Sequence, residues 1–167
     1  VENMILDTLA EATRRRVEKQ KKEKDLCTLR REAEEMPRDR EGCFRKALGR
    51  PGLNFITEVK KASPSKGLIA PDFPYVAIAR QYEALGAAAI SVLTETDYFL
   101  GSDQYLQEIR QAVETPLLRK DFTLDDYMVY QAKTLGADAI LLIAALLSGS
   151  QLQEYRLLAE SLGMDAL

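Results

Sequence analysis

The sequence contains no histidine and no long apolar run. Its 167 residues include 23 Lys and Arg and 26 Asp and Glu, but no His. This absence excludes histidine-dependent catalysis, serine triads built on histidine and most zinc sites. No window approaches the roughly 18 uninterrupted apolar residues of a membrane helix. Acidic and basic residues are mixed from Glu2 onward, so we expect neither a membrane span nor a secretory signal, and we expect a cytoplasmic location.

Cysteine is also scarce, and the charge is unevenly distributed. The two cysteines, Cys27 and Cys43, are expected to be free and reduced. The net charge of −3 argues against a nucleic-acid-binding protein. Residues 1–50 nevertheless carry 14 Lys and Arg against 11 Asp and Glu, whereas the remaining residues carry 9 against 15. We interpret the first segment as a solvated helical surface with ion pairs, and a phosphate or RNA patch is the alternative.

The composition, 46% hydrophobic and 29% charged, is typical of one soluble globular domain. Residues 4–24 combine a thin apolar stripe with good helix formers and predict a helix lying on another surface. A second helix is predicted over 26–36, ended by Pro37, and residues 43–48 supply one more apolar turn. We therefore expect residues 1–53 to form an N-terminal helical extension.

From Asn54 onward, strand-like and helix-like runs alternate. The predicted strands are 54–60, 87–94, 116–120 and 137–146, and the predicted helices lie near 74–85, 103–113 and 125–135. The strand starts are 33, 29 and 21 residues apart, a spacing typical of βαβ units with parallel strands. The tripeptide Leu-Gly-Ala occurs at 85–87 and again at 135–137, where we expect glycine to end a helix just before a strand.

Alternating units of this kind form either an open doubly wound sheet or a closed eight-stranded barrel. An open nucleotide-binding sheet usually has a glycine-rich turn after its first strand. Here that turn is Lys-Lys-Ala-Ser-Pro-Ser-Lys-Gly, with one glycine, which favours the (β/α)8 TIM barrel. Four units and a fraction do not close such a barrel. We therefore predict that residues 54–167 form an N-terminal half barrel, with strands one to four and the start of strand five.

Charged residues gather at the predicted strand ends. Glu58 and Lys60 project from one face of the first strand, about 6.6 Å apart, at the carboxyl end where barrel enzymes keep their active sites. Alternation places Lys120 on one face of the third strand and Arg119 on the other. A carboxylate with two ammonium groups suits an anionic substrate that needs a proton donor. The alternative is that these charges are solvated or simply paired with one another.

Two further features flank these charges. The turn from Ser63 to Gly67 offers hydroxyl and backbone N–H groups that suit a phosphate, although a plain proline turn explains it equally well. Phe99 and Phe122 each follow a strand end, where their rings suit either a planar substrate or core packing.

Three motifs make the chain similar to a known family. They are Glu58-Val-Lys-Lys-Ala-Ser-Pro-Ser65, then Ile90-Ser-Val-Leu-Thr-Glu95 with Tyr98-Phe99 and Gly101-Ser102, then Leu118-Arg-Lys-Asp-Phe122. In this order, and with a helical extension before them, they resemble the indole-3-glycerol phosphate synthase family over essentially the whole chain. The resemblance implies a (β/α)8 barrel and a carboxy-lyase of tryptophan biosynthesis. Its reaction closes the ring of 1-(2-carboxyphenylamino)-1-deoxyribulose 5-phosphate with loss of carbon dioxide and water, without cofactor or metal.

The resemblance also implies residue roles. The implied catalytic residues are Lys120, Lys60 and Glu58. Lys120 would donate a proton to the substrate carbonyl, and Lys60 would hold the substrate carboxylate or phosphate and share in proton transfer; which lysine serves which step is open. Glu58 would orient both lysines and the substrate hydroxyls. The implied substrate-binding residues are Ser63 on the phosphate side, Phe99 and Phe122 along the anthranilate ring, and Leu141 as an apolar wall.

The sequence departs from the family pattern in its extent. It ends at Leu167, before the second catalytic glutamate and most phosphate contacts that the family would provide, so we expect impaired activity. Two open sheet edges and an apolar inner face predict self-association or a partly molten state. A non-catalytic half-barrel module, acting through self-association or complementation, is the alternative. A longer parent would be monomeric or fused to another pathway enzyme. A phosphoribosyl isomerase barrel would explain the repeated units but not the paired lysines.

Overall fold

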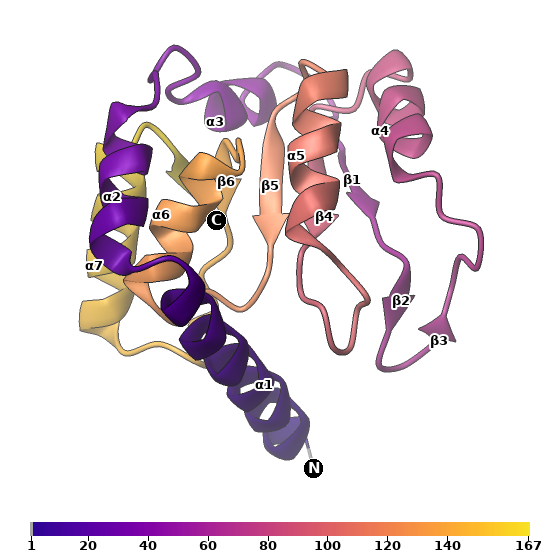
Figure 1. Ribbon diagram of the computed structural model, residues 1–167. Coiled ribbons are helices and arrows are strands. Elements are labelled where there is room, and N and C mark those ends of the chain that lie inside the picture. The colour runs from indigo at the N-terminus through magenta and orange to yellow at the C-terminus, as the bar shows by residue number, and fades with distance from the viewer. Residues whose placement is uncertain (1) are drawn as a thin grey trace.

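The computed structural model describes residues 2–167, with side chains from residue 5 onward (Figure 1). Three helices come first: α1 (Glu2–Glu23), α2 (Leu26–Glu35) and α3 (Cys43–Leu48). Asp25 caps α2 because its carboxylate accepts a hydrogen bond from the Thr28 N–H. No helix in the described residues is long and apolar enough to cross a membrane.

A five-stranded parallel sheet follows these helices. Its strands, in the order in which they pair, are β1 (Ile56–Val59), β4 (Ala89–Leu93), β5 (Leu117–Lys120), β6 (Ala139–Ile140) and β7 (Asp165–Ala166). Parallel neighbours need long connections, which the crossover helices supply: α4 (Tyr75–Ala84), α5 (Asp103–Ala112), α6 (Asp126–Thr134) and α7 (Gly149–Ser161). All five strands therefore point the same way, toward the end of the sheet where α1 lies (Figure 1).

The main core lies between the outer face of this sheet and the crossover helices. It includes Ile90 and Val92 of β4, Leu117 of β5, Ile109 of α5 and Met128 of α6. All five residues of β4 are buried, as expected for a central parallel strand that is covered on both faces. Four of its five residues are apolar and the fifth is Ser91, so this part of the sequence is a nearly continuous apolar run.

A smaller cluster covers the inner face of the sheet. Phe44 of α3 packs there with Ala89, Leu118 and Ala139 of three neighbouring strands. Because α3 lies at the amino ends of the strands (Figure 1), this packing closes that end of the inner face. The carboxyl ends of the strands are left for polar side chains and loops.

Helix α1 is fastened near those carboxyl ends. The Tyr127 hydroxyl lies 3.2 Å from the carbonyl oxygen of Gln20, which also accepts from the Lys24 N–H, and 3.1 Å from the carbonyl oxygen of Lys24, so it binds the chain at the end of α1. Lys21 forms an ion pair with Asp125 at 2.8 Å. Figure 1 shows the remainder of α1 extending past this edge of the sheet.

Both Leu-Gly-Ala tripeptides end their helices as expected. Gly86 and Gly136 adopt φ values of 81° and 86°, in the left-handed region that favours glycine. A Cβ atom at position 136 would lie 2.6 Å from Cγ of Arg110, so that position is restricted by space as well as by conformation.

The predicted helices and the first three strands agree with the observed bounds to within about two residues. The predicted strand over 137–146 is wrong, because β6 covers only Ala139–Ile140. Beyond it the Leu142 N–H donates to the Leu167 carbonyl oxygen, and the chain then turns, with the Leu146 N–H bonded to the Ile143 carbonyl oxygen. The short antiparallel hairpin of β2 (Ala62–Ser63) and β3 (Gly67–Leu68) was not predicted.

Candidate active site

One carboxylate joins two lysines at the carboxyl end of the inner face. Lys60 Nζ lies 2.8 Å from Glu58 Oε1, and Lys120 Nζ lies 2.9 Å from Glu58 Oε2. Glu58 belongs to β1 and Lys120 to β5, and β4 lies between these strands. The Ser91 hydroxyl of β4 lies 3.5 Å from Glu58 Oε2. Because the strands pair in parallel and in register, the side chains of Glu58 and Lys120 meet although they are 62 residues apart in the sequence.

The three groups carry one net positive charge. Partial burial opposes ionisation of Glu58, but the hydrogen bonds and charges of Lys60 and Lys120 outweigh it and lower the pKa of this carboxyl group. The side chains are 29–37% exposed, so the ammonium groups are accessible from solvent. This arrangement attracts an anion while keeping two proton-carrying groups at fixed positions.

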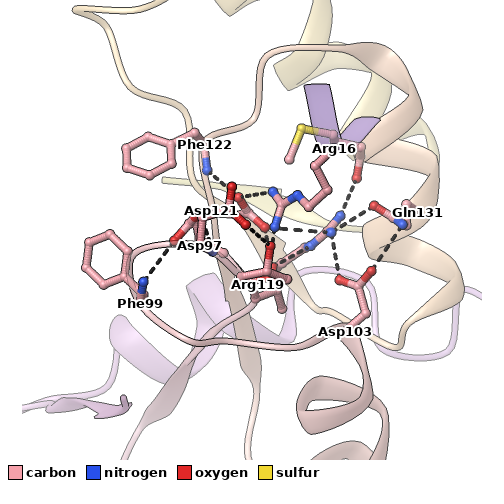
Figure 2. A network of polar contacts seen from close by, with 12 residues as sticks. Arg16, Asp97, Phe99, Asp103, Arg119, Asp121, Phe122 and Gln131 are labelled. Atoms are coloured by element: carbon pink, nitrogen blue, oxygen red, sulfur yellow. Dashed lines mark hydrogen bonds and ion pairs between the residues drawn. The ribbon is translucent and has the colours of Figure 1, made fainter. Parts of the chain in front are cut away.

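An apolar pocket opens beside Lys120. Its lining consists of Leu93, Glu95, Phe99, Lys120, Asp121, Phe122, Leu141 and Ile143. The ring centroids of Phe99 and Phe122 are 6.3 Å apart with an interplanar angle of 52°. Figure 2 shows these two rings on the same side of the polar residues behind them. Two aromatic walls with a lysine in the same lining suit a planar ring that carries a negative charge.

A second, more polar hollow lies beside Lys60. It is lined by Ile5, Lys60, Ser63, Pro64, Ser65, Lys66, Ile69 and Phe99. The Lys66 N–H lies 3.3 Å from the Ser63 hydroxyl across the turn of the β2–β3 hairpin. Since Phe99 lines both hollows, they are adjacent, and together they offer an aromatic slot next to a cationic, hydroxyl-bearing groove.

A buried polar network supports the end of β5 (Figure 2). The Thr94 hydroxyl donates to Asp121 at 2.5 Å and accepts from Arg119 Nε at 3.0 Å. Arg119 also donates to Asp103 at 2.9 Å and to Gln131 at 2.8 Å. Burial opposes ionisation of Asp121, yet the charges of Arg16 and Arg119 keep the pKa of its carboxyl group below the ordinary value. Lys120 thus lies in the sequence between Arg119 and Asp121, whose side chains are both held in place by this network.

The structure brings the residues singled out from the sequence into one region. Glu58, Lys60 and Lys120 are in contact, and Arg119 lies in the buried network behind the sheet. Phe99, Phe122 and Leu141 line the apolar pocket, and Ser63 lines the neighbouring groove. Leu141 follows β6 and is not part of the strand. The chemical roles of these residues stay predictions.

The described residues contain no group of three His, Cys, Asp or Glu side chains that could hold a metal ion. Both cysteines are free, and burial raises the pKa of the Cys43 thiol to about 11.

Comparison with known proteins places the chain among its relatives. A sequence model of the family described as indole-3-glycerol phosphate synthase matches residues 6–167. The chain belongs to this family. Proteins named indole-3-glycerol phosphate synthase are 54% identical to it in Lacticaseibacillus paracasei, 54% in Endomicrobium trichonymphae and 43% in Thermoanaerobacter pseudethanolicus. Each alignment covers 98% of this chain and 62–64% of the relative, so the chain spans less than two thirds of their length.

The indole-3-glycerol phosphate synthase family has the TIM-barrel fold, and the five parallel strands with their crossover helices are part of such a barrel. The predicted fold class is therefore confirmed. Sequence reasoning did not single out Arg16, Asp121 or Glu95, although Glu95 and Asp121 lie within family motifs. Their contacts join distant segments or backbone groups, so no spacing in the sequence pointed to them.

Proposed function

We propose that this chain supplies part of the active site of an indole-3-glycerol phosphate synthase. In the reaction, the anthranilate ring carbon that bears the carboxylate bonds to the carbonyl carbon of 1-(2-carboxyphenylamino)-1-deoxyribulose 5-phosphate. Carbon dioxide and water then leave, and indole-3-glycerol phosphate is formed. The observation that carries this proposal is the Lys60–Glu58–Lys120 contact beside an aromatic pocket. The names of the relatives support it.

The proton donor in this proposal is Lys120. Lys120 lines the apolar pocket, so its ammonium group would meet a carbonyl group that enters beside the aromatic ring. Protonation of the carbonyl oxygen removes the negative charge that develops as the new carbon–carbon bond forms. Glu58 accepts hydrogen bonds from both lysines and so fixes the Lys120 ammonium group relative to Lys60.

The two hollows divide the substrate between them. The anthranilate ring would lie between Phe99 and Phe122, with Leu141 as a further apolar wall. The phosphate would lie in the groove that contains Lys60 and Ser63, where ammonium, hydroxyl and backbone N–H groups are available. The two hollows share Phe99 in their linings, an arrangement that suits an elongated substrate with an aromatic end and a phosphate end.

Turnover measurements test the catalytic proposal. Formation of the indole product would be followed by its emission, for this chain alone and after mixing with the remaining C-terminal part of the Lacticaseibacillus paracasei relative. We expect turnover in the mixture, and a loss of about 10² to 10⁴ fold in Lys120→Met, because the proton donor is removed. Lys61→Met, which deletes a lysine that lines neither hollow, serves as the control. Equal turnover in Lys120→Met would refute the assignment.

The second candidate is a non-catalytic half-barrel module that acts through self-association or complementation. It is favoured by the exposed apolar side chains at the β1 edge, where Leu53 is 87%, Phe55 64% and Ile56 40% exposed. Association in a sedimentation series without turnover in the mixture would favour this module over the enzyme. Fusion to another pathway enzyme and a cytoplasmic location stay predictions of the sequence.

A further inference from the structure

Glu95 has a buried side chain that the proposed reaction does not use. It lies two residues after the end of β4, in the loop that leads to α5, and is 1% exposed. Its Oε1 accepts a hydrogen bond from the Asp97 N–H at 3.0 Å, and its Oε2 accepts from the N–H groups of Tyr98 at 2.8 Å and Phe99 at 2.9 Å. The carboxylate therefore gathers three consecutive backbone donors around itself.

The same loop is fixed from its other end. The Gly101 N–H donates to the Glu95 carbonyl oxygen at 2.7 Å, and the Ser102 N–H donates to the Leu93 carbonyl oxygen at 3.4 Å. A Cβ atom at position 101 would lie 2.4 Å from the Leu93 oxygen, closer than any real contact, so only glycine fits. Leu100 adopts a φ of 51°, in the left-handed region that leucine rarely occupies. The loop is thus folded tightly back on the end of β4.

This loop path determines where Phe99 lies. Its backbone N–H is bonded to Glu95, and its ring lies 6.3 Å from that of Phe122, across the pocket that Glu95 also lines. Figure 2 shows the dashed contact at the Phe99 nitrogen and the ring extending away from it. Phe122 is fixed separately, because its N–H is bonded to Asp121 at 2.8 Å.

We propose that Glu95 is a positioning residue: its carboxylate holds the loop so that Phe99 faces Phe122, and the two rings then form the slot for the aromatic part of the substrate. The role in binding rests on the proposed function, whereas the placement of Phe99 does not. Both carboxylate oxygens accept here, Oε1 from one of the three backbone donors and Oε2 from the other two. A glutamine would turn its NH₂ group toward at least one backbone N–H, and an aspartate would fall short by one methylene.

The test compares matched variants of the full chain. Glu95→Gln removes one acceptor oxygen at constant size, and Asp97→Asn removes a carboxylate from the same loop while keeping all three backbone N–H donors. Gly101→Ala displaces the loop independently of Glu95, and Phe99→Ala removes the ring. Nuclear Overhauser contacts between the Phe99 and Phe122 rings report the placement without any ligand. Binding of N-methylanthranilate is followed by its own emission, since the chain contains no tryptophan.

We expect the ring contact to be lost in Glu95→Gln and Gly101→Ala and kept in Asp97→Asn. We expect N-methylanthranilate to bind about tenfold more weakly to Glu95→Gln and to Phe99→Ala, the size of effect typical of a lost aromatic contact. An unchanged ring contact in Glu95→Gln would overturn the proposal. So would weak binding in Phe99→Ala but full binding in Glu95→Gln.

The two possible failures are distinguishable. If the unmodified chain does not bind N-methylanthranilate, the aromatic subsite of the proposed function is wrong, and the ring contact still decides whether Glu95 places Phe99. If the chain binds the probe and the ring contact does not depend on Glu95, the positioning role is wrong and the proposed function stands. Glu95→Asp adds a check on folding, because it keeps the carboxylate charge at this position and shortens the side chain by one methylene.

Discussion

The guanidinium group of Arg16 and the carboxylate of Asp121 lie 2.6 Å apart, although 105 residues separate them in the sequence. Arg16 is on α1, and Asp121 follows the last residue of β5. The Asp121 side chain is fully buried and that of Arg16 is 13% exposed. Arg16 also donates to the Thr94 carbonyl oxygen at 3.0 Å. The N-terminal helix is therefore attached to the carboxyl ends of both β4 and β5, next to Lys120.

The first prediction concerns the strength of this attachment. Arg16→Met leaves the buried Asp121 carboxylate without its closest charged partner, which typically costs about 3 kcal/mol or more. We therefore expect a decrease of this size in the free energy of unfolding, measured by urea denaturation. Arg14→Met is the control, because Arg14 pairs with Glu11 at 3.7 Å with both side chains more than half exposed. Such a surface pair contributes less than about 1 kcal/mol. Equal losses in the two variants would contradict this account.

The second prediction concerns acid. Because the pKa of Asp121 is lowered in the folded chain, its ionised form stabilises the fold above the ordinary aspartate pKa of about 3.9. That stability is lost as the pH falls below this value, through the folded pKa. In Arg16→Met the opposing effect of burial gains weight, so we expect acid unfolding to begin at higher pH. Circular dichroism between pH 7 and 2 measures the midpoint. The same midpoint in both chains would show that Asp121 does not govern acid stability.

Much of the fold could be predicted because local sequence patterns determine it. The βα spacing, the two Leu-Gly-Ala helix ends and the alternation around Glu58 and Lys60 all involve residues close in sequence. The run after Ala137 was misassigned because an apolar stretch does not show where its hydrogen-bond partners end. Here β6 pairs over only two residues with β5 on one side and with β7 on the other, and the following leucines lie in a loop and turn.

The site was predicted only in part for a related reason. The positions of Glu58 and Lys120 follow from strand ends that meet at one edge of a parallel sheet. The Arg16–Asp121 pair and the Glu95 loop depend on how a helix and a loop fold back, and charged residues in those segments look like ordinary surface charges. The network of Arg119 shows the same limit, because alternation gave the direction of its side chain but not its four hydrogen-bond partners.

The third prediction concerns the charge balance at the site. Lys120→Met removes a hydrogen bond and a positive charge from Glu58, so we expect the lowered pKa of Glu58 to rise. Titration of the ¹³C-labelled carboxyl group by nuclear magnetic resonance measures this pKa. Lys61→Met is the control, since Lys61 is not among the groups that shift the pKa of Glu58. An unchanged titration curve in Lys120→Met would show that the 2.9 Å contact does not persist in solution.

The fourth prediction concerns the open edge of the sheet. In the described residues β1 pairs only with β4, and the adjoining Phe55 is 64% exposed. Unpaired backbone groups beside apolar side chains favour association between copies, and a charge at such an edge opposes it. We expect concentration-dependent association in sedimentation velocity, weakened in Phe55→Lys. Leu157→Lys is the control, because Leu157 is 49% exposed on α7, away from β1. If both variants associate alike, the contact between copies lies elsewhere, and the β1 edge does not take part in association.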